Sequence, residues 1–407
     1  MNRYDSLSWE TMLTRFPTQT IDINDYFRIL CPDDDYPAFL DKYFELPILK
    51  RLQGIGLLCG TDWTRLYRNR FYYSRLDHSK GVALIVWHFT HDKAQTVAGL
   101  LHDVSTPVFS HVSDFRKGDA LTQTSTEEPN ALMIRQDNAL RELLAEDGLT
   151  PEQVSDYHVY PVADNEIPHL SADRLEYMYP SGLALDGSWT LDEIRYTYGD
   201  LAVLKNNDGI DELGFRTVET AELYCEKFCD IGHILQLNEN KLCLHLLGQV
   251  MNRAVDCGIL DEADFMTLSE KAVLEKLEAG LGANKNSAGA ISDVGEKSAF
   301  GASTTGYGDS VRELKQLYVT YRTMKSIKHT EKPLDNHFCV NLQVKMRYID
   351  PLVATCADKD CKSVSSAKPR LSGVPISSVS PKAKKIIEDF LSWHDKPWGC
   401  VPLANDK

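Results

Sequence analysis

Four side chains in the first half of the sequence have the chemistry of ligands for one divalent cation. They are His78, the adjacent residues His102 and Asp103, and Asp173. Neutral imidazoles supply nitrogen ligands, while the two carboxylates supply anionic oxygens that offset the charge of the cation. A mixed set of this kind suits Mn, Fe, Ni, Co or Mg, and it leaves positions for water and a phosphate oxygen. The residue types therefore indicate metal-assisted hydrolysis of a phosphate ester.

The segments around these residues predict helices that position them. Residues 90–92 have the composition of a capped turn. The helices on either side of this turn contain His78 and His102, so they are expected to run antiparallel and bring the two imidazoles together. Apolar residues recur at three- and four-residue steps, the period of an amphipathic helix, in residues 37–43, 46–58, 81–89, 94–101, 131–145, 218–228, 241–257 and 262–281.

The pattern changes in the last third of the chain. Gly, Ala, Ser, Thr and Asn dominate residues 282–308, which predicts a flexible loop or linker. Alternating apolar and polar side chains at 338–346 predict a half-buried strand, and residues 381–393 predict an amphipathic helix. We expect a mainly α chain, divided into a helical domain over 1–281, the linker over 282–308 and a small α+β region over 309–407.

The composition narrows the classes of function. The chain has 407 residues, of which 43% are hydrophobic and 25% charged, as in an ordinary globular protein. Its net charge of -15 argues against general binding to a nucleic-acid backbone, which needs dense Lys and Arg. The sequence shows neither a signal-peptide pattern nor a run of about 20 apolar residues. We therefore expect a cytoplasmic protein that does not enter the membrane.

The cysteines are expected to be reduced thiols. There are ten of them at irregular spacings, which does not suggest a disulfide framework. Cys225, Cys229 and His233 recur at four-residue steps along one helical face and superficially resemble a soft metal site. No fourth ligand is identifiable, so packing in the core is the favoured interpretation.

A set of motifs in fixed order carries a resemblance to a known family. The motifs are residues 75–82 (RLDHSKGV), 100–103 (LLHD), 109–111 (FSH) and 173–177 (DRLEY). Together they resemble the HD superfamily of metal-dependent phosphohydrolases and, within it, the deoxynucleoside triphosphate triphosphohydrolases. Residues 50–56 resemble the helix that precedes the first metal histidine of that branch. The resemblance implies an HD-domain helix bundle.

The resemblance and the chemistry together suggest substrate-binding residues. Arg75 and Arg174 can neutralise charge on phosphate oxygens. In the resemblance, Arg75, Arg174 and Tyr177 fall on positions that hold the nucleotide phosphates and sugar, and Asp114 falls on a position that supports catalytic groups. Arg174 could equally be a surface salt-bridge partner of Asp173 or Glu176.

Two positions depart from the pattern of the triphosphohydrolase branch. Thr106 stands where the branch has a catalytic histidine, and Glu127 stands in place of a second histidine. The acid for the leaving group would then be His111, Glu127 or Glu128. His111 has the alternative role of a capping or buried hydrogen-bond partner. Triphosphohydrolase, phosphomonoesterase and phosphodiesterase chemistry all stay open.

Two functions of different classes are compatible with these residues. The favoured one is a metal-dependent phosphohydrolase that hydrolyses a nucleotide or another small phosphate ester through metal-activated water. The alternative is an HD-fold regulatory or scaffold protein that binds metal or nucleotide without turnover. The resemblance also implies assembly as a homo-oligomer.

Overall fold

The structure of the protein is a computed structural model. It describes residues 2–5, 9–17, 21–118, 120–121, 127–287, 304–355 and 371–405. The side chains of residues 127–128, 283–287 and 304–307 lie outside this description.

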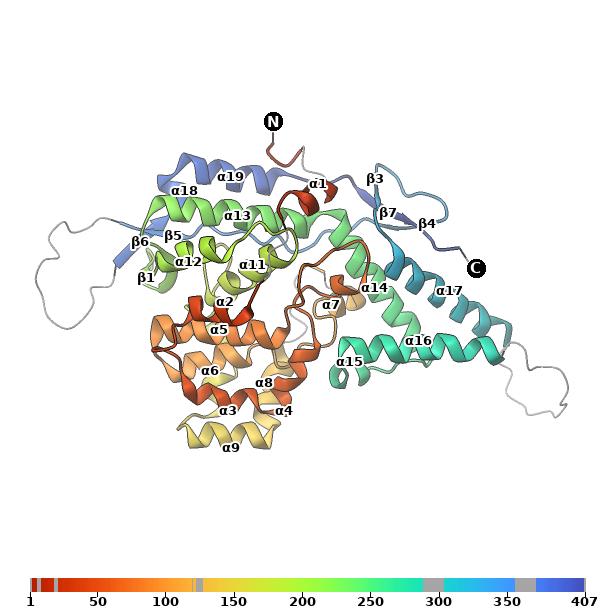
Figure 1. Ribbon diagram of the computed structural model, residues 1–407, viewed down its shortest axis with the longest axis horizontal. Coiled ribbons are helices and arrows are strands. Elements are labelled where there is room, and N and C mark those ends of the chain that lie inside the picture. Colours follow the sequence, from red (N-terminus) through yellow and green to blue (C-terminus); the bar gives the residue numbers. More distant parts are fainter. Residues whose placement is uncertain are drawn as a thin grey trace, which may run out of the picture.

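Helices dominate the described chain, which confirms the mainly α class (Figure 1). The helices before residue 200 are α1 (Trp9–Thr14), α2 (Ile23–Leu30), α3 (Asp41–Phe44), α4 (Pro47–Lys50), α5 (Arg75–Thr90), α6 (Lys93–Leu101), α7 (Val112–Lys117), α8 (Glu127–Gln136), α9 (Asn138–Glu146), α10 (Pro151–Val154), α11 (Ala172–Ala184) and α12 (Leu191–Gly199). The later helices are α13 (Val218–Gln236), α14 (Asn238–Asp256), α15 (Asp264–Thr267), α16 (Glu270–Ser287), α17 (Thr304–Thr323), α18 (Ile376–Val379) and α19 (Pro381–Ser392).

The predicted hairpin of α5 and α6 is confirmed. α5 begins with a capping box, in which the Ser74 and Asp77 side chains each bond to the other residue's backbone N–H. It ends at His91, whose φ of 50° is the left-handed conformation that stops a helix. Asp92 then caps α6 by accepting a hydrogen bond from the N–H of Gln95. The two helices pack along their length, so the chain turns back within two residues.

The strands form two small sheets, neither of which is built from one continuous segment. The first is closed in the order β1 (Leu201–Lys205), β2 (Asp211–Phe215), β5 (Leu352–Ala354) and β6 (Leu371–Pro375). The second has the order β3 (Lys328–Thr330), β7 (Trp398–Pro402) and β4 (His337–Val340). The strand predicted over 338–346 is thus only partly correct, because β4 ends at Val340 and the chain continues extended without a partner strand.

The C-terminal region packs directly on the helical part. In the closed sheet, β2 pairs in parallel with β5, and β1 pairs in parallel with β6. α19 lies along α13, as Figure 1 shows at the top of the view. α16 continues to Ser287 and α17 begins at Thr304, so both ends of the predicted linker are helical, while residues 288–303 lie outside the description. The three-part domain division stays a prediction.

The cysteine predictions have mixed outcomes. Cys225 and Cys229 are fully buried in an apolar cluster with Phe390, as the core interpretation of this helical face expects. Cys339 and Cys400, by contrast, face each other across β4 and β7 and form a disulfide. The expectation that all cysteines are reduced is therefore wrong for this pair. Strand pairing places the two Cα atoms 4.1 Å apart, a closeness that sequence spacing does not reveal.

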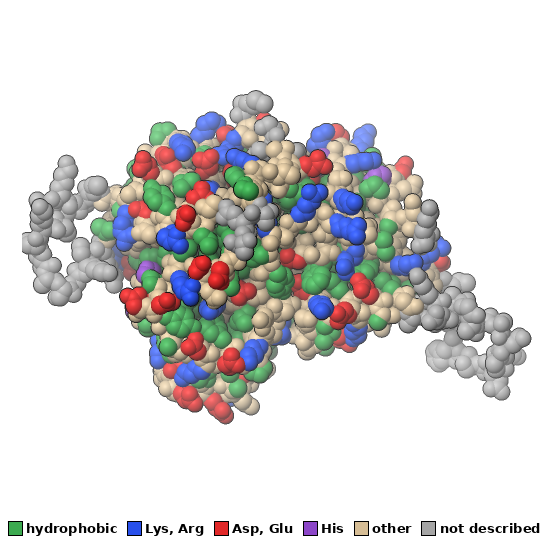
Figure 2. Space-filling model, viewed as in Figure 1, with side chains coloured by type: hydrophobic (Ala, Val, Ile, Leu, Met, Phe, Trp, Pro, Cys, Tyr) green, Lys and Arg blue, Asp and Glu red, His purple; other side chains and the backbone are tan. Residues whose placement is uncertain are grey.

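Charged side chains are not concentrated in one patch on the face of the molecule shown in Figure 2. Acidic, basic and hydrophobic side chains are interspersed over the face shown in Figure 2. Among the described residues, no helix is both long enough and apolar enough to cross a membrane.

Candidate metal centre and active site

The structure brings the four predicted metal ligands together, although they come from three elements. His78 is in the second turn of α5, His102 caps the end of α6, Asp103 follows it, and Asp173 lies in the first turn of α11. The Nε2 atoms of the two histidines are 3.2 Å apart. Asp173 Oδ1 is 3.1 Å from Nε2 of His78 and 3.7 Å from Nε2 of His102. Asp103 Oδ2 is 3.8 Å and 3.5 Å from the same two atoms.

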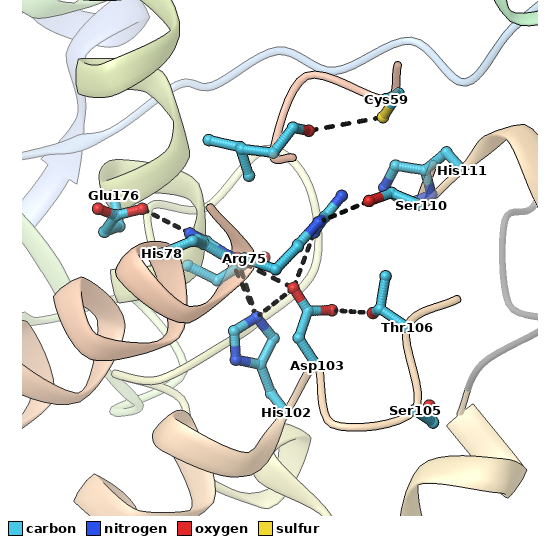
Figure 3. A network of polar contacts seen from close by, with 12 residues as sticks. Cys59, Arg75, His78, His102, Asp103, Ser105, Thr106, Ser110, His111 and Glu176 are labelled. Atoms are coloured by element: carbon cyan, nitrogen blue, oxygen red, sulfur yellow. Dashed lines mark hydrogen bonds and ion pairs between the residues drawn. The ribbon is translucent and has the colours of Figure 1, made fainter. Parts of the chain in front are cut away.

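The second nitrogen of each imidazole is anchored by the protein. Nδ1 of His102 lies 2.7 Å from the carbonyl oxygen of Gly99, which can only accept, so Nδ1 carries the proton. Nδ1 of His78 lies 2.5 Å from Oε2 of Glu176 (Figure 3). In neutral rings both Nε2 atoms therefore direct lone pairs toward the same point. Without a metal, a proton on Nε2 of His78 can bridge the two rings by donating to Nε2 of His102 at 3.2 Å. When that proton is lost, both lone pairs become available to one cation, so the donor set fits a metal ion.

The electrostatics of the site favour positive charge at this point. Burial lowers the pKa of His78, but Glu176 and Asp173 outweigh that effect and raise the pKa to about 10. Burial opposes ionisation of Asp103, yet Arg75 and then the two histidines hold the pKa of its carboxyl well below the usual value. The same balance of burial against the histidines lowers the pKa of Asp173. Asp103 and Asp173 are thus anionic. A cation bound between the Nε2 atoms of His78 and His102 would balance their negative charge.

Asp103 is held by two partners. Arg75 Nη1 donates to its Oδ2 at 2.7 Å, and the hydroxyl of Thr106 donates to its Oδ1 at 2.8 Å (Figure 3). Arg75 also donates from Nε to Ser110 Oγ at 2.9 Å. Phe109 and Ser110 have φ values of 60° and 51°, so this turn adopts the left-handed conformation twice in succession. Thr106, at the position where the resemblance leads one to expect a histidine, thus orients the carboxylate of the predicted ligand Asp103.

His111 and Asp114 form an ordered pair beside the four predicted metal ligands, which we call the metal cluster. Nδ1 of His111 lies 3.0 Å from Oδ2 of Asp114, which is almost fully buried. Because both residues belong to the start of α7, the pair is fixed by one turn of helix. Burial lowers the pKa of His111, and Arg347 lowers it further against the effect of Asp114. His111 lines the same cavity as the metal ligands.

A cavity of about 1090 Å³ opens onto the metal cluster. Its walls include Arg75, Arg174 and Tyr177, so all three predicted substrate residues border the same space. Most donors of Arg174 are nevertheless committed within the protein: Nε bonds to the His169 carbonyl, and Nη2 bonds to Asn165. Arg174 does form a salt bridge, but its partner is Asp164, at 3.4 Å from Nη2, and not Asp173 or Glu176 as the alternative interpretation supposed.

One predicted residue cannot be placed. Glu127 is the first residue of α8, and its side chain lies outside the described part of the structure. The neighbouring Asn130, on the same helix, lines the cavity and accepts a hydrogen bond from the N–H of Ser105. α8 therefore borders the cavity.

Sequence reasoning missed Glu176 and Arg347. Glu176 is fully buried, and its Oε1 also accepts hydrogen bonds from the hydroxyls of Tyr26 at 3.0 Å and Tyr73 at 2.5 Å. Its position three residues after Asp173, on the same helical face, was the available signal. Arg347 comes from the extended segment after β4, far away in sequence, and no local pattern marks it as a cavity residue.

Comparisons with known proteins find partial likenesses. No family model matches the sequence. The chain is 30% identical over 129 residues to a protein of Cordyceps militaris named metal-dependent phosphohydrolase cns2; this covers 32% of this chain and 36% of that protein. It is 29% identical over 142 residues to the uncharacterized protein YdhJ of Bacillus subtilis, covering 34% and 41% respectively. The chain thus spans less than half the length of the curated relatives it matches.

A solved structure shares the overall fold. It is that of a hypothetical protein from Aquifex aeolicus, with a TM-score of 0.54 and 12% sequence identity. The superposition covers 90% of this chain and 92% of that one, so the likeness extends well beyond the metal cluster.

Proposed function

We propose that the protein is an HD-type metal-dependent phosphohydrolase that acts on a nucleotide or another small phosphate ester. The observation that carries the proposal is the convergence of His78, His102, Asp103 and Asp173, with both imidazole Nε2 atoms aimed at one point. The partial likeness to a protein named metal-dependent phosphohydrolase supports the same class of reaction.

One divalent ion, of Mn, Fe, Ni, Co or Mg, would be held by these four residues. When bound, it supplies a Lewis acid for a phosphoryl oxygen and for water. Asp103 and Asp173 balance its charge, while Glu176 and the Gly99 carbonyl fix the two rings. The buried Arg75 beside Asp103 supplies a positive charge for the scissile phosphate.

His111 is the proposed proton carrier of the reaction. Asp114 occupies its Nδ1, so Nε2 is the atom that exchanges a proton with the leaving group or with water. Asp114 acts through His111 and is a positioning residue. Glu127 keeps the same proposed role of acid as an alternative to His111, and Tyr177 is proposed to contact the substrate from the cavity wall.

The experiment that tests the proposal is product analysis by mass spectrometry. The protein is incubated with Mn²⁺, Mg²⁺, Ni²⁺ or Co²⁺ and with pooled nucleotides and phosphate esters. Wild-type protein should give a metal-dependent product, and Asp103→Ala should lower kcat/KM by more than about 100-fold because a metal ligand is lost. Release of triphosphate would favour the triphosphohydrolase branch, whereas release of phosphate alone would favour a monoesterase.

The matched control is Asp192→Ala. This aspartate lies in the first turn of α12 with its side chain 92% exposed, so its loss should leave kcat/KM within about twofold. Circular dichroism and thermal unfolding of both variants check that the fold is intact. Absence of any product with every metal, together with retained binding of metal and nucleotide, would refute the enzyme and support the regulatory or scaffold alternative.

A further inference from the structure

A buried carboxylate holds the turn that precedes His111. Glu270, the first residue of α16, is fully buried. Its Oε1 accepts hydrogen bonds from the backbone N–H groups of Gly56 at 3.0 Å and Phe109 at 3.2 Å. Its Oε2 accepts a hydrogen bond from Trp63 Nε1 at 2.7 Å. A carboxylate is costly to bury unless donors satisfy its oxygens, and these three bonds connect α16 to two segments far away in sequence.

The turn that Glu270 holds has an unfavourable backbone conformation. Phe109 and Ser110 have φ values of 60° and 51°, a region that side chains other than glycine rarely adopt. Such a conformation persists only where the surrounding contacts enforce it. The N–H of Val108 donates to the Phe265 carbonyl at 2.9 Å, and the next N–H along the chain is the one bound by Glu270. Residues 265–270 therefore fix the entry to the turn.

A path of hydrogen bonds leads from Glu270 to the metal cluster. The carbonyl of Gly56, whose N–H is bound by Glu270, accepts from the Ser110 hydroxyl at 3.2 Å. Ser110 Oγ accepts from Arg75 Nε at 2.9 Å, and Arg75 Nη1 donates to Asp103 Oδ2 at 2.7 Å (Figure 3). Because Arg75 can only donate, the single proton of the Ser110 hydroxyl points to the Gly56 carbonyl. Each bond along the path thus has a fixed direction.

The same turn sets the position of His111. The Phe109 carbonyl accepts from the N–H of Val112 at 3.1 Å, and the Ser110 carbonyl accepts from the N–H of Ser113 at 3.1 Å. The first turn of α7 is therefore built on the two left-handed residues, and His111 stands between them and the helix. A displacement of Phe109 would move the start of α7 and His111 with it.

We propose that Glu270 is a positioning residue of the proposed phosphohydrolase, which holds residues 109–111 so that Arg75 and His111 keep their places at the metal cluster. Glu270 acts through this turn and not by contact with the substrate. The ionised carboxylate suits the role, because both of its oxygens are acceptors for the three donors around it. The inference rests on the proposed function, which assigns Arg75 and His111 their roles.

The protonation of Glu270 gives the inference a pH signature. Burial raises the pKa of Glu270 to about 7, and the charge of Asp62 raises it as well, against the three hydrogen bonds. The other titratable groups that act on it are Cys59, Tyr72 and Tyr321, which stay neutral near pH 7 because burial raises their pKa values. As pH falls through about 7, one oxygen of Glu270 gains a proton and changes from acceptor to donor. At least one of the three hydrogen bonds is then lost.

Binding of Mn²⁺ alone tests the inference without requiring turnover. Full-length wild type and Glu270→Gln are titrated calorimetrically with Mn²⁺ at pH 8 and pH 6. At pH 8 the Kd of the variant should be about 3- to 10-fold above that of wild type, less than for a direct partner of a ligand because the effect passes through Ser110 and Arg75. At pH 6 the ratio of the two Kd values should fall toward one, because the wild-type carboxyl is then protonated as well.

A double-mutant cycle tests the path. If Glu270 acts through Ser110, the Kd of the double variant Glu270→Gln/Ser110→Ala should equal that of the weaker single variant within about twofold, rather than combine both losses. Glu270→Asp keeps the charge and should recover part of the affinity at pH 8. It also replaces Glu270→Gln in both experiments if thermal unfolding shows that the amide variant does not fold.

The control is Glu275→Gln, the same substitution on the same helix. The Glu275 side chain is 64% exposed, so its loss should leave the Kd for Mn²⁺ unchanged at both pH values.

The outcomes separate this inference from the proposed function. Equal Kd values for wild type and Glu270→Gln at pH 8, a ratio that is the same at both pH values, or no binding of Mn²⁺ by wild type overturns the inference, even if a phosphate ester is hydrolysed. Absence of hydrolysis by a wild-type protein whose Mn²⁺ binding depends on Glu270 defeats the proposed function. Glu270 would then support a metal site without turnover.

Discussion

Glu176 links the metal cluster to the core through a single carboxylate. One oxygen accepts from the two tyrosine hydroxyls, and the other accepts from His78. A carboxylate behind a ligating imidazole fixes the tautomer and raises the basicity of the ring. Glu176 would therefore influence a metal ion bound at the proposed site through His78, without being a ligand itself.

We expect Glu176→Gln to weaken metal binding by about 10- to 100-fold. The amide keeps the size of the side chain but has only one acceptor oxygen, so it cannot serve both the tyrosines and His78. Titration with Mn²⁺, followed by metal analysis of the dialysed protein, measures the change. Glu219→Gln, at an exposed position in α13, is the matched control. A metal affinity within twofold of wild type would show that Glu176 serves the core alone.

At the scale of elements, the packing of α5 on α11 depends on Gly81. A Cβ at this position would lie 2.4 Å from Oε1 of Glu176, closer than any normal contact. Because three hydrogen bonds hold the Glu176 carboxylate, the side chain cannot move aside without breaking them. The absence of a side chain at Gly81 therefore lets the two helices approach.

Gly81→Ala should destabilise the protein by about 1–3 kcal/mol through overpacking. Ala is ordinarily a better helix former than Gly, so a loss of stability on Gly81→Ala would show that the added Cβ clashes with Glu176. Gly282→Ala on α16, where a Cβ would meet nothing within 4 Å, should instead stabilise by up to about 1 kcal/mol. Urea unfolding of the three proteins measures both values. Equal stability of wild type and Gly81→Ala would contradict the packing argument.

The sequence was sufficient to predict elements with a strong local signal. The α5 and α6 helices have long apolar periodicity, and Asp92 marks the turn between them, so the meeting of His78 and His102 could be anticipated. The length of the predicted helix at 131–145 was wrong, because Asp137 caps a new helix, α9, in its middle. A capping aspartate inside an apolar pattern is easily taken for a surface residue.

Short strands and long-range contacts could not be predicted. β5 has three residues, and its pairing with β2 joins segments about 140 positions apart, so no local period reveals it. Arg347 is placed by long-range contacts of another kind, because the N–H of the nearby Lys345 donates to the Ala120 carbonyl and the Lys345 carbonyl accepts from Gln236 Nε2. Glu176 looked like a surface salt-bridge residue because its sequence neighbours include Arg174, and only the structure shows that it is buried.

At the scale of the whole molecule, His329 ties three separated regions together. Its Nδ1 lies 2.7 Å from Asp395 Oδ1, and its Nε2 lies 3.0 Å from Glu239 Oε1. Because each nitrogen faces a carboxylate, both donate and the ring is an imidazolium rather than a metal ligand. The hydrogen bonds from Asp395 and Glu239 raise the pKa of His329 to about 10, despite burial. The link joins β3, the start of α14 and the segment after α19.

The pH dependence follows from the sign of this shift. The folded pKa lies above the unfolded value of 6.5, so the stabilisation is fully present below that pH and is lost as pH rises toward about 10. We expect His329→Gln to lose about 1–3 kcal/mol at pH 6 and much less at pH 9.5. Urea unfolding at the two pH values measures this, with the exposed His394→Gln as control. A loss of equal size at both pH values would rule out the imidazolium link.

The order of the residues in the chain also sets when each part of the proposed site exists during synthesis. All four proposed metal ligands have been made by residue 173, whereas Val344, Lys345 and Arg347 of the cavity lining come about 170 residues later. A growing chain therefore contains its proposed cation ligands for nearly half of its translation before the last segment of the cavity lining is made. Arg75, Arg174 and Tyr177 are made together with the proposed ligands, so only the part of the lining after β4 is added late.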